Sequence, residues 1–348
     1  MKATQPVNSG NNNKPRIAIV PGDPSGIGPE LIAKLLQDEE VLTAANIVLV
    51  GDEHLWRRGA KQAQTDIKIN SITADELSTQ FGLCHLPLNT INEEDVKIAE
   101  VTVTSGTTSL RCLDKALDLA QSAAVDGVLF APFNKSAMTS AGLNAEDEHR
   151  YMARYLGFKG YHSEINVLDS MMTTRVTSHI GLKHVAENIT EDGIILAVEL
   201  AESTLKRAGK NHPSIAVAAL NPHAGDNGKF GREEIDIITP AIEQCQNRQM
   251  NVTGPWPSDT VFLKAKRGEV DAVVTMYHDQ GQIAIKLLGF ERGVTVAGGL
   301  PIPVATPAHG TAFDIAGQNK ANVSATRQAF DLLVKMATTY RNERLACS

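Results

Sequence analysis

Three histidines each follow a predicted strand, and imidazoles in such positions are suited to binding a divalent metal ion. The strand and histidine pairs are residues 175–178 with His179, residues 215–220 with His223, and residues 272–277 with His278. In open α/β sheets, ligands bind at the carboxyl ends of the strands. Three imidazoles at that edge could hold one cation and leave coordination positions open for a substrate.

Two aspartates are the nearest carboxylate candidates for a catalytic role. Asp279 is adjacent to His278, where it could orient the imidazole ring or a bound water. Asp259 lies in the stretch 257–260 and could equally be a turn or helix-capping residue. The histidines also have an alternative, because their rings could form hydrogen bonds to the loop backbone instead of binding metal.

A glycine-rich turn follows the first predicted strand, residues 17–20. It contains Gly22 and Asp23 and leads into a helix with Pro29 in its first turn. Such a strand–turn–helix is a weak signal for anion binding at the helix N-terminus. The sequence has no GxGxxG motif and no Walker A loop, so a nucleotide would not be held by the usual dinucleotide turn.

A second glycine-rich loop, residues 306–323, reads TPAHGTAFDIAGQNKANV. It resembles the adenine-binding loop of isopropylmalate and isocitrate dehydrogenases, in which small residues let a nucleotide approach the backbone. The residues expected to bind a nucleotide cofactor are Gly22, Asp23, His309, Gly310, Thr311, Ala312 and Asn322.

Strands and helices are predicted to alternate along the chain. Further strands are expected at 47–50 and 128–131, and helices at 190–208, 233–246 and 325–340. Another helix begins near residue 105, with Ser105 or Thr107 as its N-cap, because apolar residues recur there at helical spacing. This alternation is typical of a doubly wound, parallel α/β sheet.

Composition limits the class of protein and its partners. The chain has 348 residues, enough for two lobes, and a formal net charge of −7, so we expect neither nucleic acid nor an anionic membrane surface as a partner. Residues 1–14 resemble a disordered polar leader without the apolar core of a signal peptide, and no apolar run is long enough to span a bilayer. Four cysteines without a CxxC pair are expected to be free thiols in a reducing cytoplasm.

Seven stretches together resemble the 4-hydroxythreonine-4-phosphate dehydrogenase family. They are PGDPSGIGPE at 21–30, APFNK at 131–135, VTSHIGL at 176–182, LNPHAG at 220–225, GPWPSDTVF at 254–262, MYHDQGQIAIK at 276–286 and HGTAFDIAG at 309–317. Their order and spacing cover nearly the whole chain after the leader.

The resemblance implies a fold of the isopropylmalate/isocitrate dehydrogenase-like α/β/α type, with two lobes around a cleft. We expect one lobe, on the nucleotide side, to comprise residues 15–139 and 301–348. The other lobe, on the metal and dimer side, would comprise residues 140–300. The resemblance also implies a homodimer with the active site at the subunit boundary.

The family's chemistry is oxidation of a secondary alcohol with NAD or NADP, followed by metal-assisted loss of CO₂ from a carboxylated small-molecule substrate. By resemblance, His179, His223 and His278 bind the metal, one of them across the dimer, and His149 and Lys286 contact substrate. Imidazole ligands favour zinc, with manganese, cobalt or magnesium as alternatives. Lys286 could anchor an anion or donate a proton, so it is a catalytic candidate with Asp259 and Asp279.

Three positions depart from the family pattern. Arg150 replaces a threonine, Thr295 replaces an asparagine, and Val304 replaces an arginine. Without the arginine, the protein loses a bidentate ion pair with an anionic substrate. The valine in its place would form an apolar wall, which suits a ring better than a phosphate. We therefore expect an unphosphorylated carboxylated vicinal diol, as in the terephthalate cis-dihydrodiol dehydrogenase branch of the family.

Other substrates and another class of protein remain as alternatives. Within the family these are 4-phosphohydroxy-L-threonine, which belongs to pyridoxal phosphate biosynthesis, and a sugar-acid phosphate. A metal-dependent hydrolase is the alternative class, since three histidines and a water also form a hydrolytic site. The adenine-type loop argues against a hydrolase, which needs no nucleotide pocket.

Overall fold

A computed structural model describes residues 13–347 and divides the chain into two compact units. The first unit contains the residues up to 157 and those from 302 onward, and the second contains residues 158–301. Residues 1–12 of the predicted leader lie outside the described residues. Among the described residues no helix is long and apolar enough to cross a membrane.

The described residues of the first unit form five parallel strands in the order β3-β2-β1-β4-β11. Their bounds are β1 Arg16–Val20, β2 Asn46–Gly51, β3 Leu83–Pro87, β4 Gly127–Phe130 and β11 Val304–Pro307. Every residue of β2 and β4 is buried. Continuous burial of this kind is expected when helices cover both faces of a parallel sheet.

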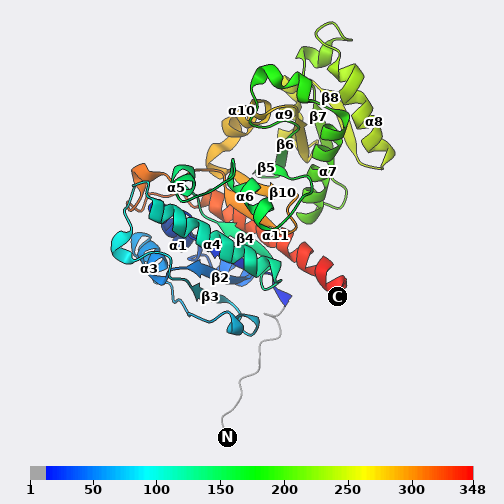
Figure 1. Cartoon of the computed structure of the whole chain (residues 1–348). Coiled ribbons are helices and arrows are strands. Elements are labelled where there is room, and N and C mark those ends of the chain that lie inside the picture. The colour runs from blue at the N-terminus through cyan, green and yellow to red at the C-terminus, as the bar shows by residue number, and fades with distance from the viewer. Residues whose placement is uncertain (1–12, 348) are drawn as a thin grey trace. The chain divides into compact units, whose positions relative to one another are not determined.

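In the described part of this unit, seven α-helices accompany these strands (Figure 1). They are α1 Gly28–Leu35, α2 Glu39–Ala44, α3 Glu53–Gln62, α4 Val103–Gln121, α5 Lys135–Ser140, α6 Glu148–Tyr155 and α11 Ser324–Ala346. The predicted N-cap of α4 is wrong, because the Thr102 side chain accepts the backbone N–H of Ser105 at 3.0 Å. The Ser105 and Thr107 hydroxyls instead donate to backbone carbonyls of the first turn.

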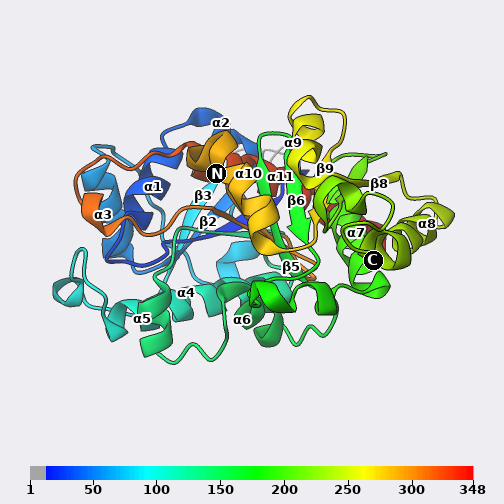
Figure 2. The same ribbon diagram turned by 90° about the horizontal axis from the view of Figure 1, so that it is seen from above.

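Helix α6 ties residues 140–157 to the first unit. Tyr151 and Tyr155 on α6 donate hydrogen bonds to Asp114 and Asp118 on α4, at 2.6 and 2.8 Å. In Figures 1 and 2, α5 and α6 both lie along α4. The division therefore falls at residue 157, whereas the sequence placed it at residue 139.

The second unit has six strands in the order β10-β5-β6-β9-β7-β8. Their bounds are β5 Ser163–Leu168, β6 Met171–Arg175, β7 Ile215–Ala218, β8 Val252–Trp256, β9 Ala272–Thr275 and β10 Val294–Gly298. β5 pairs antiparallel with both β6 and β10, and the remaining pairs are parallel. The prediction of a wholly parallel sheet fails here because two residues, Asp169 and Ser170, join β5 to β6 as a hairpin, and Asp169 has a φ of 52°.

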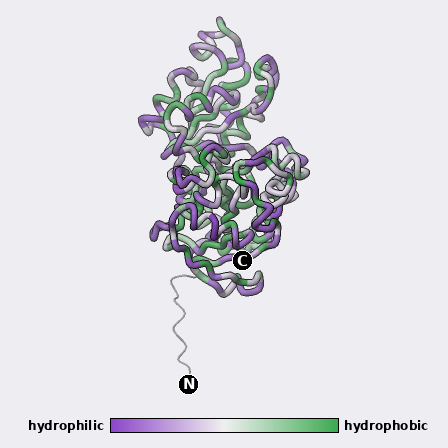
Figure 3. Tube along the Cα trace, turned by 90° about the vertical axis from the view of Figure 1, so that its left-hand side faces the viewer, coloured by the Kyte–Doolittle hydropathy of each residue, from purple (hydrophilic) through white to green (hydrophobic). Residues whose placement is uncertain are grey.

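Four α-helices belong to this unit: α7 Glu191–Arg207, α8 Thr239–Asn247, α9 Ser258–Lys266 and α10 His278–Gly289. An apolar cluster that includes Val261, Val273 and Ile285 packs α9 and α10 against β7 and β9. This packing places the first residue of α10, His278, just beyond the end of β9. Hydrophobic and hydrophilic stretches alternate along the described trace of both units (Figure 3).

Candidate active site

Two of the three candidate metal ligands lie beside each other in the second unit. The ring centroids of His179 and His278 are 5.8 Å apart. β6 ends at Arg175, earlier than the sequence predicted, so His179 stands four residues beyond the strand. The intervening chain still follows its neighbour, because Thr177 N–H donates to the Met276 carbonyl at 3.1 Å. That pairing holds the two histidines at the same edge of the sheet.

The backbone is unusual at His179 and His223. Their φ angles are 55° and 53°, and Ala224 after His223 has a φ of 51°. Side chains other than glycine rarely adopt this left-handed region, and residues held there cluster at ligand and active sites. This local strain therefore supports a functional role for both loops.

His278 is oriented by its neighbour in the sequence. Its Nδ1 and the Asp279 carboxylate form a hydrogen bond of 2.6 Å, with the ring as donor when Nδ1 carries the proton. That tautomer leaves Nε2 as the free lone pair, which is the arrangement by which carboxylates orient metal-binding histidines. The pair therefore fits a divalent cation in both spacing and donor type.

The three histidines do not form one cluster within a single chain. Among residues 13–347, no group of three or more His, Cys, Asp or Glu side chains is arranged to hold a metal ion. His223 is exposed, and its ring lies 6.3 Å from that of Phe230. The role of His223 as a ligand therefore stays a prediction.

A cavity of about 420 Å³ surrounds the His179–His278 pair. Its walls include Asp279 and the large apolar side chains of Ile180, Leu182 and Ile283. Leu182 is 71% exposed and Ile283 is 60% exposed. Apolar residues exposed this far around a polar centre are typical of a surface that another molecule covers.

The other residues predicted for this unit lie on three different elements. Asp259 is exposed in the first turn of α9, where a carboxylate interacts favourably with the helix dipole. Lys286 is exposed on α10. Thr295 on β10 accepts a long hydrogen bond, 3.4 Å, from the Asn166 amide. The roles of these three side chains stay predictions.

His149, Arg150 and Val304 belong to the first unit. His149 is 6% exposed on α6, and the guanidinium of Arg150 forms an ion pair with Glu146. Val304 begins β11, pairs with Val128 and has no exposed surface. In this structure Val304 therefore presents no wall that a substrate could touch.

The two glycine-rich segments meet in the first unit. The backbone N–H of Ile27 donates to the Thr311 carbonyl at 3.1 Å, and a Cβ on Gly26 would lie 2.8 Å from the same oxygen. By contrast, a Cβ on Gly310 would meet nothing within 4 Å, so space is open beside the loop. The sequence predicted both segments as cofactor-binding, and the structure places them in contact.

Three side chains of these segments form hydrogen bonds to the backbone of residues close to them in the sequence. Asp23 is fully buried, and its Oδ1 accepts the Ser25 N–H at 2.8 Å. Burial outweighs the hydrogen bonds to this carboxyl and raises its pKa to about 6. Burial also lowers the pKa of His309, whose Nδ1 lies 3.1 Å from the Gly310 carbonyl. Asn322 accepts the Ser324 N–H at 2.9 Å at the start of α11.

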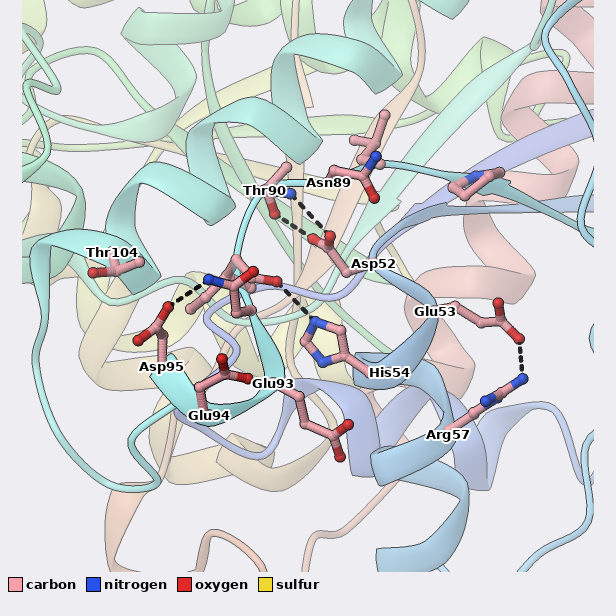
Figure 4. A pocket seen from close by; sticks show the side chains of 14 residues that line it. Asp52, Glu53, His54, Arg57, Asn89, Thr90, Glu93, Glu94, Asp95 and Thr104 are labelled. Atoms are coloured by element: carbon pink, nitrogen blue, oxygen red, sulfur yellow. Dashed lines mark hydrogen bonds and ion pairs between the residues drawn. The ribbon is translucent and has the colours of Figure 1, made fainter.

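A larger cavity, about 750 Å³, lies in the first unit beyond the carboxyl ends of β2 and β3 (Figure 4). Its lining includes five carboxylates: Asp52, Glu53, Glu93, Glu94 and Asp95. Thr90 donates to the Asp52 carboxylate, and Arg57 pairs with Glu53 at 2.6 Å. This excess of negative charge disfavours an anionic group, so the cavity is unsuited to a phosphate.

Sequence reasoning missed Glu30 and Lys34 on α1. Both contact the segment at 319–321, directly after the second glycine-rich loop. The only signal was Glu30 itself, at the end of the PGDPSGIGPE stretch. Its burial could not be read from that stretch.

The comparison with protein families identifies the chain. The family described as pyridoxal phosphate biosynthetic protein PdxA matches residues 43–333. The chain belongs to the PdxA family. It is accordingly an α/β NAD(P)-dependent dehydrogenase, an oxidoreductase acting on a small molecule.

Individual relatives of the PdxA family cover almost the whole chain. A Pseudomonas aeruginosa protein provisionally named 4-hydroxythreonine-4-phosphate dehydrogenase 2 is 49% identical, over 92% of this chain and 97% of its own length. D-threonate 4-phosphate dehydrogenase of Pectobacterium atrosepticum is 38% identical, over 92% of this chain and 99% of its own. The crystal structure of Klebsiella pneumoniae 4-hydroxythreonine-4-phosphate dehydrogenase superposes with a TM-score of 0.82, at 34% identity, and covers 93% of this chain and 98% of that one.

The terephthalate branch is more distant. The structure of terephthalate 1,2-cis-dihydrodiol dehydrogenase from Burkholderia xenovorans has a TM-score of 0.67 at 26% identity, and covers 92% of this chain and 98% of that one. The likeness to the 4-phosphate dehydrogenases is therefore greater in both sequence and structure. The comparisons therefore support a phosphorylated substrate better than the unphosphorylated diol that the sequence analysis expected from Val304.

Proposed function

We propose that this PdxA-family enzyme oxidises the 3-hydroxyl of a four-carbon carboxylate that carries a 4-phosphate, with NAD(P) as hydride acceptor and loss of CO₂. 4-Phosphohydroxy-L-threonine and D-threonate 4-phosphate share this skeleton and differ in the amino or hydroxyl group at C2. Both contain a hydroxyl β to the carboxylate. Oxidation gives a β-keto acid, whose carboxylate leaves as CO₂ once the new carbonyl can accept the electron pair.

The identity of the relatives carries the substrate proposal. The 49% and 38% identical relatives both bear names of 4-phosphate dehydrogenases, against 26% for the diol dehydrogenase. The burial of Val304 removes the observation that favoured a diol. Arg150, 43% exposed and paired with an exposed glutamate, offers a guanidinium to an anionic group.

We infer that His179, His278 and a His223 imidazole hold a divalent cation, with zinc as the first expectation. When bound, such a cation lowers the pKa of a substrate hydroxyl and stabilises the negative charge left by decarboxylation. Asp279 keeps the His278 ring in the ligating orientation through the 2.6 Å hydrogen bond. Lys286, Asp259 and Asp279 remain the candidates for moving the hydroxyl proton.

The cofactor is assigned to the two glycine-rich segments of the first unit. Their contact through Ile27 and Thr311, together with the open space at Gly310, supports a nucleotide lying along the 309–312 backbone. His149, Thr295 and Lys286 are proposed substrate contacts.

A homodimer is part of this proposal. Leu182, Ile283 and Leu287 are 71%, 60% and 82% exposed around the histidine pair, and a second copy of the chain would cover them. The absence of His223 from any metal-binding group of the described residues agrees with a ligand donated between copies. The family resemblance implies the same arrangement.

An assay with the metal-loaded protein tests the substrate. NADH or NADPH formation at 340 nm is followed with 4-phosphohydroxy-L-threonine, D-threonate 4-phosphate and terephthalate cis-dihydrodiol in parallel. We expect turnover of at least one phosphorylated acid and none of the diol. Turnover of the diol alone would overturn the proposal and restore the interpretation based on Val304.

A further inference from the structure

A buried ion pair on α1 stands out among the Glu–Lys pairs of the described residues. Lys34 Nζ lies 2.8 Å from Glu30 Oε1, and the exposed fractions of the two side chains are 18% and 0%. Helical pairs at this spacing are usually solvated and contribute little to stability. Burial of a carboxylate costs solvation energy, so a wholly buried member must be compensated by further contacts.

Those further contacts all go to the end of the second glycine-rich loop. Glu30 Oε1 accepts the backbone N–H of Ala321 at 2.9 Å. Lys34 Nζ donates to the carbonyls of Asn319 and Ala321, at 3.1 and 2.9 Å. Asn319 has a φ of 57°, so the chain passes through a left-handed residue where Lys34 binds it. Charge-assisted hydrogen bonds are among the strongest that can hold such a turn.

The same helix also holds the start of the loop. The Ile27 N–H binds the Thr311 carbonyl at 3.1 Å. Ile27 and Leu31 form a buried apolar cluster with Ala321, against which Ala312, Ile315 and Ala316 pack. The loop is therefore attached to α1 near both ends, and Gly310, directly before the first attachment at Thr311, faces open space.

We propose that the Glu30–Lys34 pair is a clamp that positions the loop 309–322 for the nicotinamide dinucleotide. The proposal rests on the assignment of this loop to the cofactor, made above. Preorganisation of a binding loop raises affinity because less conformational entropy is lost on binding. Glu30 and Lys34 are thus positioning residues and need not touch the cofactor.

Two variants and a matched control separate positioning from general stability. Glu30→Gln removes the charge and keeps the shape, while Lys34→Met removes both bonds to carbonyls and keeps much of the apolar stem. The control is Glu202→Gln on α7, where Lys206 pairs with Glu202 at 3.0 Å and the same spacing. Measurements on the purified full chain are hydrogen exchange of the 309–322 peptide, NADH affinity by fluorescence, and KM for cofactor and substrate separately.

Faster exchange in 309–322 and weaker NADH binding are expected in both clamp variants. Because a less ordered loop loses more conformational entropy on binding, the dissociation constant of NADH should rise about tenfold, which corresponds to about 1.4 kcal/mol. The KM for substrate and all properties of Glu202→Gln should stay unchanged. If Glu30→Gln folds poorly, Lys34→Met provides the same comparison. A fall in thermal stability with exchange and affinity unchanged would leave the pair with a structural role only and overturn the proposal.

A third variant distinguishes failure of the clamp from failure of the cofactor assignment. Gly310→Leu adds a bulky side chain beside the loop, at a position where a Cβ would meet nothing within 4 Å, and leaves Glu30 and Lys34 unchanged. If Gly310→Leu leaves NADH binding intact, the loop does not bind the cofactor and both proposals fall together. If Gly310→Leu weakens binding but the α1 variants change neither exchange nor affinity, the cofactor assignment stands and only the clamp is wrong.

Discussion

The imidazole rings of His179 and His278 lie 5.8 Å apart although 99 positions separate the residues in the sequence (278 − 179). Two imidazoles bound to one cation have their ring centres at about this separation when metal–nitrogen bonds are about 2.0 Å. The pair forms because β6 and β9 are parallel neighbours, so both chains leave the sheet at the same edge.

His179→Ala and His278→Ala should each abolish stable metal binding. Removal of a group that only orients a ligand costs roughly 10- to 100-fold in metal affinity, so removal of a ligand itself should cost more. Metal content after dialysis, measured by atomic emission, checks this. His212→Ala is the control, because His212 is exposed and precedes β7, at the amino end of the strand. Full metal content in both pair variants would place the metal elsewhere.

Asp279→Asn should weaken metal binding while leaving the ligands in place. The 2.6 Å bond to His278 Nδ1 would lose its charge, so the ring would be held less firmly, and a loss of about 10- to 100-fold in affinity is expected. Competition with a chelating dye measures the change. Asp259→Asn serves as the comparison for a carboxylate without a contact to the pair. Equal effects of the two substitutions would show that Asp279 has no special orienting role.

The sequence predicted those elements of the fold that depend on local patterns, and it failed where contacts between distant residues decide the structure. Buried strands such as β1 and β4 and the helix α7 were predicted, since apolar runs and helical spacing are local signals. The hairpin β5–β6 was missed because its turn, Asp169–Ser170, lacks the usual glycine signal. Thr102 caps α4 in place of Ser105 because the helix begins earlier than its apolar stripe.

The candidate site was only partly predictable for the same reason. The positions of His179 and His278 could be predicted from the ends of the strands that precede them. That their rings lie close together depends on the parallel pairing of β6 with β9, which the sequence did not reveal. Val304 was interpreted as a pocket wall from an aligned position alone, and its burial in β11 depends on neighbours that the sequence does not identify. Glu30 was missed because nothing local indicates that a glutamate will be buried against residue 321.

Val304→Arg should damage folding and should not restore a phosphate site. Val304 has no exposed surface, so an arginine there would bury a positive charge among apolar strands. Burial of an unpaired charge typically lowers the free energy of unfolding by several kcal/mol. Soluble yield and thermal unfolding measure the loss. Val101→Arg is the matched control, because Val101 is 51% exposed and should accept the substitution. A stable Val304→Arg protein that binds phosphorylated substrate more tightly would show that this position does face the substrate.

Leu182→Glu should dissociate the proposed dimer. Leu182 is 71% exposed beside His179, and a charge buried there in an interface without a partner would oppose association by several kcal/mol. Sedimentation velocity should show the sedimenting mass fall by about half, and metal content should fall with it if His223 is donated between copies. Leu345→Glu on α11, 58% exposed in the first unit, should leave the mass unchanged. A wild-type chain that sediments as a monomer would contradict the dimer directly.

Asp23→Asn should stabilise the protein at neutral pH and lose that advantage in acid. Burial raises the pKa of Asp23 from its ordinary value near 3.8 to about 6, and hydrogen bonds from Ser25 and Ser105, together with the charge of Arg58, oppose the shift. The folded state therefore binds the proton more tightly than the unfolded state. The stability this contributes is complete below pH 4 and is lost as the pH rises through 6.

An asparagine remains neutral at every pH, so it avoids the cost of a buried charge above pH 6. At one pKa unit per about 1.4 kcal/mol, the gain at pH 7.5 should be on the order of 3 kcal/mol at most. Urea unfolding at pH 4 and pH 7.5, without cofactor, measures the difference. Asp66→Asn, at an exposed carboxylate, should change stability little at either pH. A loss of stability at pH 7.5 in Asp23→Asn would mean that the charged carboxylate is required by its hydrogen bonds to Ser25, and that their contribution exceeds the cost of burial.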